Sequence, residues 1–187
     1  EVGSKFDFWG GKGSATVAAF DIRRNNIASQ DPSNPNLTVL VGEQSSKGIE
    51  LAAGIRPTSQ WQLQGNLSLI RARYENFVQG GVSRAGNVPQ LVPQQVANLW
   101  ASYAITPTVT ASAGLRHVGK VYGNAANTKF WPSYTLLDLG LAWKINRTTT
   151  LTTRVRNATD RTYAEETRDQ VYLGAPRTLD VALHTAF

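Results

Sequence analysis

The sequence contains no cysteine among its 187 residues, and charged residues make up only 17% of it. Without cysteine the chain has no disulfide, no thiolate metal site and no cysteine nucleophile. Long apolar runs are missing as well, since no stretch approaches the roughly 20 consecutive apolar residues that a membrane-spanning helix needs. If the chain lies in a membrane, it must therefore cross the membrane as β-strands.

Sequence motifs of catalysis are also missing. There is no Gly-x-Ser-x-Gly nucleophile elbow and no glycine-rich loop of the kind that binds phosphate. The two histidines, His117 and His184, lie far apart and lack the spacing of metal ligands. We therefore expect no enzymatic activity, no catalytic residues, no metal site and no cofactor.

The net charge of +6 and the pI of about 9.8 could suggest a nucleic-acid partner. However, the basic residues are scattered along the chain and form neither a dense run nor a known reader motif. We expect no binding to nucleic acid.

What the sequence does contain is two-residue alternation of apolar and polar side chains, the pattern of half-exposed β-strands. It predicts an all-β, antiparallel fold with strands at residues 1–9, 14–27, 38–55, 60–75, 93–103, 108–122, 133–143, 149–158 and 177–187. Short turns alternate with long polar loops between these strands. Transmembrane β-barrels have this arrangement, with the short turns on the periplasmic side.

The two faces of each predicted strand differ in polarity. In residues 60–75 the residues on one face are apolar and those on the other are polar: Trp61, Leu63, Leu67 and Leu69 against Gln62, Gln64, Asn66 and Ser68. This pattern indicates an apolar outer surface around a polar lumen. A soluble antiparallel sandwich also alternates in this way and is the alternative.

Aromatic residues recur on the outward face beside each short turn and at the chain end. They are Phe8, Trp61, Tyr103, Trp143 and Phe187. Aromatic side chains favour the level of the lipid headgroups, so we expect these five to form the periplasmic girdle. A last strand that ends on phenylalanine is also the usual ending of outer-membrane barrel proteins, and we expect it to serve as the signal to the barrel assembly machinery.

Nine strands would leave two unpaired sheet edges, which lipid cannot satisfy with hydrogen bonds. The alternation begins in mid-pattern at Glu1, without a signal peptide. We therefore expect the chain to be a fragment whose remaining strands come from sequence before Glu1.

Several segments, in this order and spacing, resemble the C-terminal half of the barrel of TonB-dependent siderophore receptors, especially the ferrichrome type. They are residues 1–5, 19–23, 46–51, 92–93, 156–163 and 174–178. The resemblance implies a 22-stranded barrel filled by an N-terminal plug, with a TonB box that couples transport to TonB, ExbB and ExbD. We expect plug and box to be absent from residues 1–187.

The resemblance also assigns roles to individual residues. Glu1 and Glu50 match two barrel glutamates that pair with plug arginines, and alternation independently turns both toward the lumen. An unpaired carboxylate on a wall that a plug covers would be costly to desolvate. An ordinary hydrated charge on the lumen wall is the alternative.

For ligand binding, the family places ferric siderophores under the extracellular loops, against aromatic and basic side chains. The matching candidates are Tyr122, Phe130, Trp131, Arg168 and Tyr172. The alternative is that these residues form the upper girdle or pack loop against loop.

At the outer rim, outward alternation continues past the apolar band to Arg71 and Arg73, and it places Lys47 just beyond Ile49. Reflecting the two strands about their short turn sets residue 47 level with residue 69. We expect Lys47, Arg71 and Arg73 to contact lipopolysaccharide phosphates, with snorkelling into the headgroups as the alternative.

Together these observations predict an outer-membrane receptor of a Gram-negative bacterium that takes up ferric siderophores, with the iron as cargo. The alternatives are a passive porin, a receptor for haem or cobalamin, and an outer-membrane enzyme or adhesin.

Overall fold

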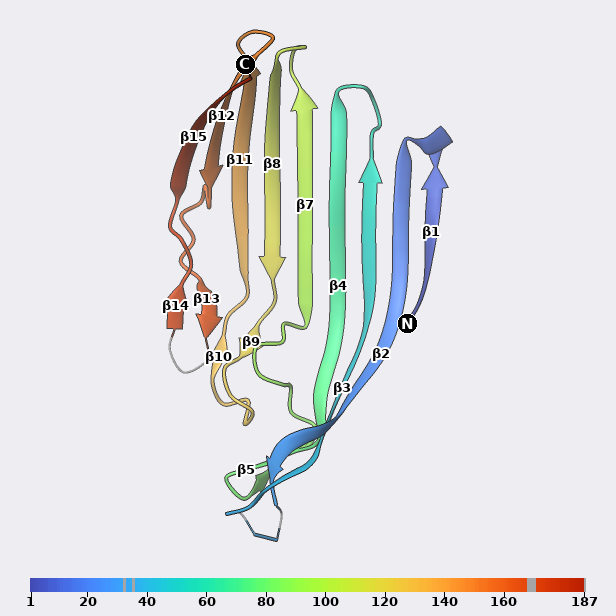
Figure 1. Cartoon of the computed structure of the whole chain (residues 1–187), viewed down its shortest axis with the longest axis vertical. Coiled ribbons are helices and arrows are strands. Elements are labelled where there is room, and N and C mark those ends of the chain that lie inside the picture. The colour runs from blue at the N-terminus through green and yellow to red at the C-terminus, as the bar shows by residue number, and fades with distance from the viewer. Residues whose placement is uncertain (32, 35, 168–170, 187) are drawn as a thin grey trace.

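The alternating segments form one curved antiparallel sheet in the computed structural model, which describes residues 1–31, 33–34, 36–167 and 171–186. Within these residues nine strands pair in the order β1-β2-β3-β4-β7-β8-β11-β12-β15, so each long strand lies beside its neighbours in sequence (Figure 1). The strands are β1 (Val2–Phe8), β2 (Gly13–Gln30), β3 (Thr38–Ile55), β4 (Trp61–Asn76), β7 (Gln95–Ala104), β8 (Val109–Val118), β11 (Tyr134–Lys144), β12 (Thr149–Arg156) and β15 (Thr178–Thr185). The predicted all-β antiparallel fold is confirmed.

The strand register gives each face of the sheet one character. Leu51 of β3 pairs with Leu67 of β4, which pairs with Ala97 of β7. The same parity continues to the other edge, where Val155 of β12 pairs with both Leu139 of β11 and Leu179 of β15. Partners in an antiparallel pair point to the same side, so one face of the sheet is apolar from β2 to β15.

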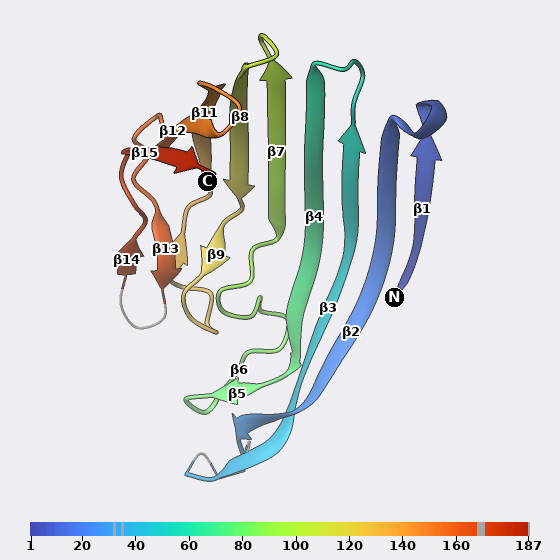
Figure 2. The same ribbon diagram turned by 45° about the horizontal axis from the view of Figure 1, so that its top comes forward.

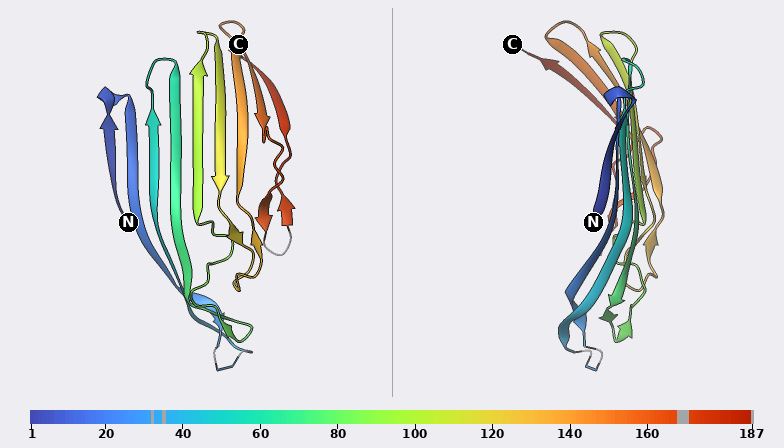
Figure 3. Two further views of the ribbon diagram at one scale, coloured as in Figure 1. Left: turned by 180° about the vertical axis from the view of Figure 1, so that it is seen from behind. Right: turned by 90° about the vertical axis from the view of Figure 1, so that its right-hand side faces the viewer.

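This apolar face is left uncovered. Leu139 is 41% exposed, Leu99 51% and Leu183 62%, and no side chain in the described part of the chain combines large size with complete burial. A soluble sandwich would cover these residues with a second sheet, but the described strands form a single layer (Figure 3). The sandwich alternative is therefore wrong, and the apolar face is suited to lipid.

The sheet curves so that its two edges, β1 and β15, lie on the same side of its middle strands (Figure 3). Those edge strands are not paired with each other within the described residues. The polar side chains line the concave face, as expected for part of a barrel wall. No helix in the described part of the chain is long and apolar enough to cross a membrane.

The long loops contain more structure than expected. Short hairpins form within them: β5 (Val78–Gln79) with β6 (Val82–Ser83), β9 (Val121–Tyr122) with β10 (Phe130–Trp131), and β13 (Ala164–Thr167) with β14 (Val171–Leu173) (Figure 2). The strand predicted at residues 108–122 is accordingly wrong at its end. The strand β8 ends at Val118, and two residues without strand structure, 119 and 120, separate it from β9.

The β2–β3 ribbon extends beyond the sheet and contacts the loop after β4. The buried Ser29 hydroxyl accepts a hydrogen bond from the Val78 N–H at 2.8 Å and donates to the Val78 carbonyl at 3.2 Å. At the opposite end of the sheet, the β1–β2 turn forms a 3-10 turn, η1 (Trp9–Gly11), in which Trp9 and both glycines have positive φ.

Candidate functional site

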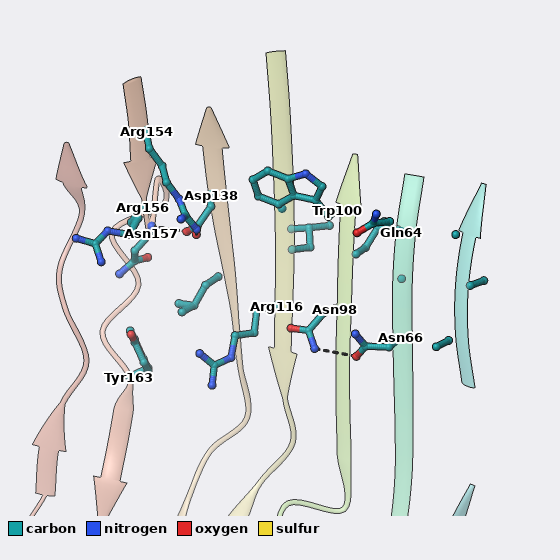
Figure 4. Close-up of a pocket in the computed structure, with 18 of the residues that line it drawn as sticks. Gln64, Asn66, Asn98, Trp100, Arg116, Asp138, Arg154, Arg156, Asn157 and Tyr163 are labelled. Carbon is teal, nitrogen blue, oxygen red and sulfur yellow. Dashed lines mark hydrogen bonds and ion pairs between the residues drawn. The ribbon is translucent and has the colours of Figure 1, made fainter. Parts of the chain in front are cut away.

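The polar face surrounds a hollow of about 790 Å³ on the concave side of the sheet (Figure 4). Alternate residues of the middle strands point into it, and the segment after β12 folds back along one side of it. The labelled lining residues are Gln64, Asn66, Asn98, Trp100, Arg116, Asp138, Arg154, Arg156, Asn157 and Tyr163. The hollow therefore lies where a barrel would have its lumen.

Two arginines of β12 are neutralised on this wall. Arg154 donates to Asp138 Oδ2 at 2.7 Å, and Arg156 binds both oxygens of Asp180, at 2.8 and 3.2 Å. All four side chains remain partly exposed, so each pair contributes on the order of 1 kcal/mol or less. Their main effect is to order the wall.

Asn157 ties the loop after β12 to the sheet. This residue is only 3% exposed, and its backbone N–H donates to Asp138 Oδ1 at 2.9 Å. Its side-chain amide donates to the carbonyls of Arg161 and Ala175, at 2.9 and 3.1 Å, and its Oδ1 accepts from the Arg161 N–H at 2.8 Å. One side chain thus joins both ends of the loop that carries β13 and β14.

Two neighbouring contacts close the same loop. Asp160 Oδ1 accepts from the Arg177 N–H at 2.8 Å, and the Tyr163 ring packs directly on Gly174. A Cβ at residue 174 would overlap that ring, so only glycine permits this contact. The segments 156–163 and 174–178 are two parts of the family resemblance. In the structure they contact each other and together close the loop.

The expected plug-contacting residues are placed as alternation predicted. Glu50 of β3 pairs with Ser68 of β4 on the concave face and accepts a hydrogen bond from its hydroxyl at 3.3 Å. Glu50 is exposed and has no cation within 4.0 Å among the described residues. Glu1 directly precedes β1, whose Gly3 pairs with Ala18, which pairs in turn with Glu50. Both positions thus belong to one patch of the wall.

The structure brings together some of the expected ligand-binding aromatics. Tyr122 and Phe130 are cross-strand partners in the β9–β10 hairpin, and the Lys120 ammonium lies 4.6 Å from the first ring centre and 5.4 Å from the second. Sequence analysis missed Lys120, although its spacing of two from Tyr122 is a usable signal. Phe130 is 55% exposed, so the cluster remains open to a ligand.

The other expected ligand residues do not join this cluster. Trp131 is the neighbour of Phe130 in β10 and packs against Gly123, where its indole N–H is buried without a partner in the described part of the chain. Tyr172 lies in the separate β13–β14 hairpin and is exposed. Arg168 lies outside the described residues.

At the outer rim, Lys47 and Arg71 are direct register partners. The expected alignment of residue 47 with residue 69 is therefore wrong by two residues, because the pairing is set by where the β3–β4 turn begins. Lys47 pairs with Asp21 at 2.8 Å, and Arg73 pairs with Glu75 at 2.8 Å. Arg71 alone of the three cations has no carboxylate within 4.0 Å among the residues described.

At the opposite rim, four of the five residues expected to form the girdle lie near the short turns. Trp61 and Tyr103 are register partners with ring centres 4.7 Å apart. Phe8 lies over Gly13, and Trp143 is exposed on the same face. Phe187 lies outside the described residues.

No group of three or more His, Asp or Glu side chains in the described part of the chain could hold a metal ion. His117 is instead held between Thr135 Oγ1, at 2.9 Å, and Gln95 Nε2, at 3.4 Å. This histidine belongs to the outer surface of the sheet.

Comparison with known proteins gives consistent results. Residues 1–158 match the family model described as TonB dependent receptor-like, beta-barrel. The chain is 30% identical over 173 residues to the probable TonB-dependent siderophore receptor PiuA of Acinetobacter baumannii, covering 87% of the chain and 23% of that protein. It is 32% identical over 193 residues to the metal-pseudopaline receptor CntO of Pseudomonas aeruginosa, covering 98% of the chain and 26% of that protein.

Solved structures agree with these relatives. The crystal structure of the siderophore receptor PiuA from Acinetobacter baumannii matches with a TM-score of 0.87 and 27% identity, over 98% of the chain and 27% of that structure. The ferric preacinetobactin receptor BauA from the same species matches with a TM-score of 0.83 and 29% identity, over 98% of the chain and 28% of that structure. The chain thus spans about a quarter of the length of the proteins it matches.

Proposed function

Because the chain belongs to the TonB-dependent receptor β-barrel family, we propose that it is the C-terminal part of the barrel of a receptor that takes up ferric siderophores. The family places it in the outer membrane of a Gram-negative bacterium. The observation that supports this function best is the match of the whole nine-stranded sheet to the siderophore receptor PiuA, at 27% identity and a TM-score of 0.87.

The proposal includes the rest of the receptor. Sequence before Glu1 supplies a plug and the remaining strands of a 22-stranded barrel, and a TonB box couples uptake to TonB with ExbB and ExbD. The barrel assembly machinery inserts the barrel, and Phe187 is its recognition signal. In this proposal the receptor is a transporter rather than an enzyme, and iron is carried as substrate rather than held as a resident cofactor. Glu1 and Glu50 contact the plug from the concave face.

The ligand is held from the loop side of the sheet by Lys120, Tyr122 and Phe130, with Trp131, Arg168 and Tyr172 as further contacts. Aromatic rings can pack on the flat surfaces of a ferric chelate, and a cation can pair with its acidic groups. The curated relatives include receptors for metal-pseudopaline and for ferrioxamine B. The proposal is therefore a receptor for ferric siderophores as a class.

Uptake of radioactive iron tests this function directly. The full-length receptor is expressed in a strain without other siderophore receptors and offered ferrioxamine B, ferrichrome or a catecholate complex. At least one complex is expected to support uptake that disappears without TonB. Phe130→Ala is expected to raise the KM about tenfold, the loss of roughly one cation–π or aromatic contact. Ile145→Ala, in a short turn at the opposite rim, should leave the KM unchanged.

Uptake that persists without TonB would indicate a passive porin instead. Uptake of haem or cobalamin alone would keep the receptor but change its ligand.

We also propose that the outer rim contacts lipopolysaccharide through Lys47, Arg71 and Arg73, with Arg71 contributing most. Lys47 and Arg73 are already paired with carboxylates. Arg71 has no carboxylate partner among the described residues, so its guanidinium is available for a bidentate phosphate contact. Arg71→Gln is therefore expected to remove most of the lipopolysaccharide that the triple Gln variant removes. The amount that co-purifies with the receptor is the measurement. Lys144→Gln, at the periplasmic rim, is the matched control, and equal retention in all variants would leave snorkelling as the explanation.

A further inference from the structure

Arg116 of β8 is a cation on the concave wall that has no ion-pair partner in the described part of the chain. Arg154 and Arg156, which line the same hollow, each bind a carboxylate. In contrast, no carboxylate among the described residues lies within 4.0 Å of the Arg116 guanidinium. The guanidinium also makes no hydrogen bond to any described residue. Its five N–H groups are thus free for a partner.

Other hydrogen-bond donors line the same hollow on either side of Arg116 (Figure 4). Asn98 Nδ2 donates to Asn66 Oδ1 at 2.9 Å, which leaves the Asn66 amide nitrogen free to donate. Burial raises the pKa of the Tyr163 phenol above its usual value, so its hydroxyl keeps its proton, and this hydroxyl has no partner in the described part of the chain. A guanidinium on the same wall as such donors favours an anion, and its planar fork fits a carboxylate.

The position of Arg116 along β8 indicates which part of the receptor supplies that anion. Arg116 lies seven positions from Val109, the partner of the girdle residue Trp143. With a rise of about 3.3 Å per residue and a tilt of about 40°, it stands roughly 18 Å above the girdle, within an apolar band about 25 Å tall. Its cross-strand row is two residues closer to the short turns than that of Glu50 and Ser68. Arg116 therefore lies at the depth of the barrel lumen, below the ligand-binding loops.

We propose that Arg116, which lines the hollow together with Asn66 and Tyr163, binds an aspartate or glutamate side chain of the plug domain. This inference rests on the proposed function, because that function supplies the plug. The contact has the opposite polarity to the one at Glu50, where the wall is the acidic partner. Two contacts of opposite sign on the same wall would allow the plug to seat in one orientation only, because a misplaced plug would bury like charges together.

Glu165 is the competing partner within the chain. It lies in β13, lines the same hollow and has no ion pair within 4.0 Å in the residues described. Both Glu165 and Arg116 act electrostatically on the Tyr163 phenol, so the two charges lie on the same side of the hollow. The experiment must therefore separate a plug carboxylate from Glu165.

Site-specific photocrosslinking of the full-length receptor makes that separation. The photoreactive amino acid p-benzoylphenylalanine is placed at position 116, at position 50, or at position 115, where Leu115 faces lipid. After irradiation of outer membranes, crosslinked peptides are identified by mass spectrometry. Position 116 is expected to crosslink to a peptide from sequence upstream of Glu1, and position 115 is not.

Crosslinks from position 116 that reach only residues 164–173, while position 50 reaches upstream sequence, would overturn the Arg116 contact alone. Failure at both positions 50 and 116 would overturn the proposed plug as well.

Charge substitution provides the second measurement. Arg116→Gln is expected to speed hydrogen exchange in the crosslinked plug peptide about tenfold, the loss of one charge-assisted hydrogen bond. Arg116→Lys should keep most of the protection, because the charge remains. Glu165→Gln is the matched control and should leave the exchange rate unchanged. An equal effect of Glu165→Gln and Arg116→Gln would instead show that Arg116 pairs with its own hairpin.

Discussion

Leu67→Arg is expected to destabilise the folded barrel of the full-length receptor by about 2 to 4 kcal/mol, the cost of arginine on the lipid face at the membrane midplane. Leu67 shares the apolar face with its register partners Leu51 and Ala97. It lies six positions from Trp61 along β4, which is roughly 15 Å above the girdle in a band about 25 Å tall. The arginine can therefore reach neither interface without distorting the strand.

Gln64→Arg is the matched control, because Gln64 lies on the same strand but faces the hollow. It makes no hydrogen bond within the described residues, so its replacement removes no contact. Heat-modified gel mobility and urea unfolding of the two variants measure the difference. Equal stability of both would contradict the assignment of the apolar face to lipid.

Asn157→Ala is expected to cost about 3 kcal/mol or more in local stability and to release the loop at residues 158–176. The substitution leaves the Arg161 N–H and the carbonyls of Arg161 and Ala175 without their partner, and each unsatisfied buried group costs about 1 to 3 kcal/mol. Asn157 also has φ of 48°, a conformation that alanine adopts only with strain. Hydrogen exchange of the loop is the direct measurement.

Two further substitutions separate the causes. Asn157→Gly removes the side chain but tolerates positive φ, so it should be more stable than Asn157→Ala by about 1 kcal/mol. Asn157→Asp keeps the acceptor for Arg161 but turns an oxygen toward two carbonyls, so it should release the loop as well. Unchanged exchange in all three variants would show that Asp160, Tyr163 and Gly174 are sufficient to close the loop.

The sequence could predict the sheet because its signals are local. Alternation in residues 60–75 assigned Leu67 outward and Gln64 inward, and a strand has no other way to arrange its side chains. Turn length was less informative, because a shift in where the β3–β4 turn begins moves the pairing by two residues without changing either face. Lys47 was therefore placed on the correct face but opposite residue 69, whereas its partner is Arg71.

The candidate site was harder to predict because it depends on contacts between distant residues. The Asn157 side chain donates a hydrogen bond to the main-chain carbonyl of Ala175, 18 positions away. A main-chain carbonyl is present in every residue, so such a contact has no sequence signature. In the sequence, Lys120 cannot be distinguished from an ordinary loop cation. Only the β9–β10 hairpin shows that its ammonium lies over the rings of Tyr122 and Phe130.

By itself, the sequence determined the strands, the two faces, the aromatic rim and the family, since these depend on residue type at a period of two. The tertiary structure decided the pairing of charges. It neutralised Arg154 and Lys47 and left Arg116 and Arg71 without a carboxylate partner among the described residues. Salt bridges form within about 4 Å across strands, and that distance depends on register and curvature.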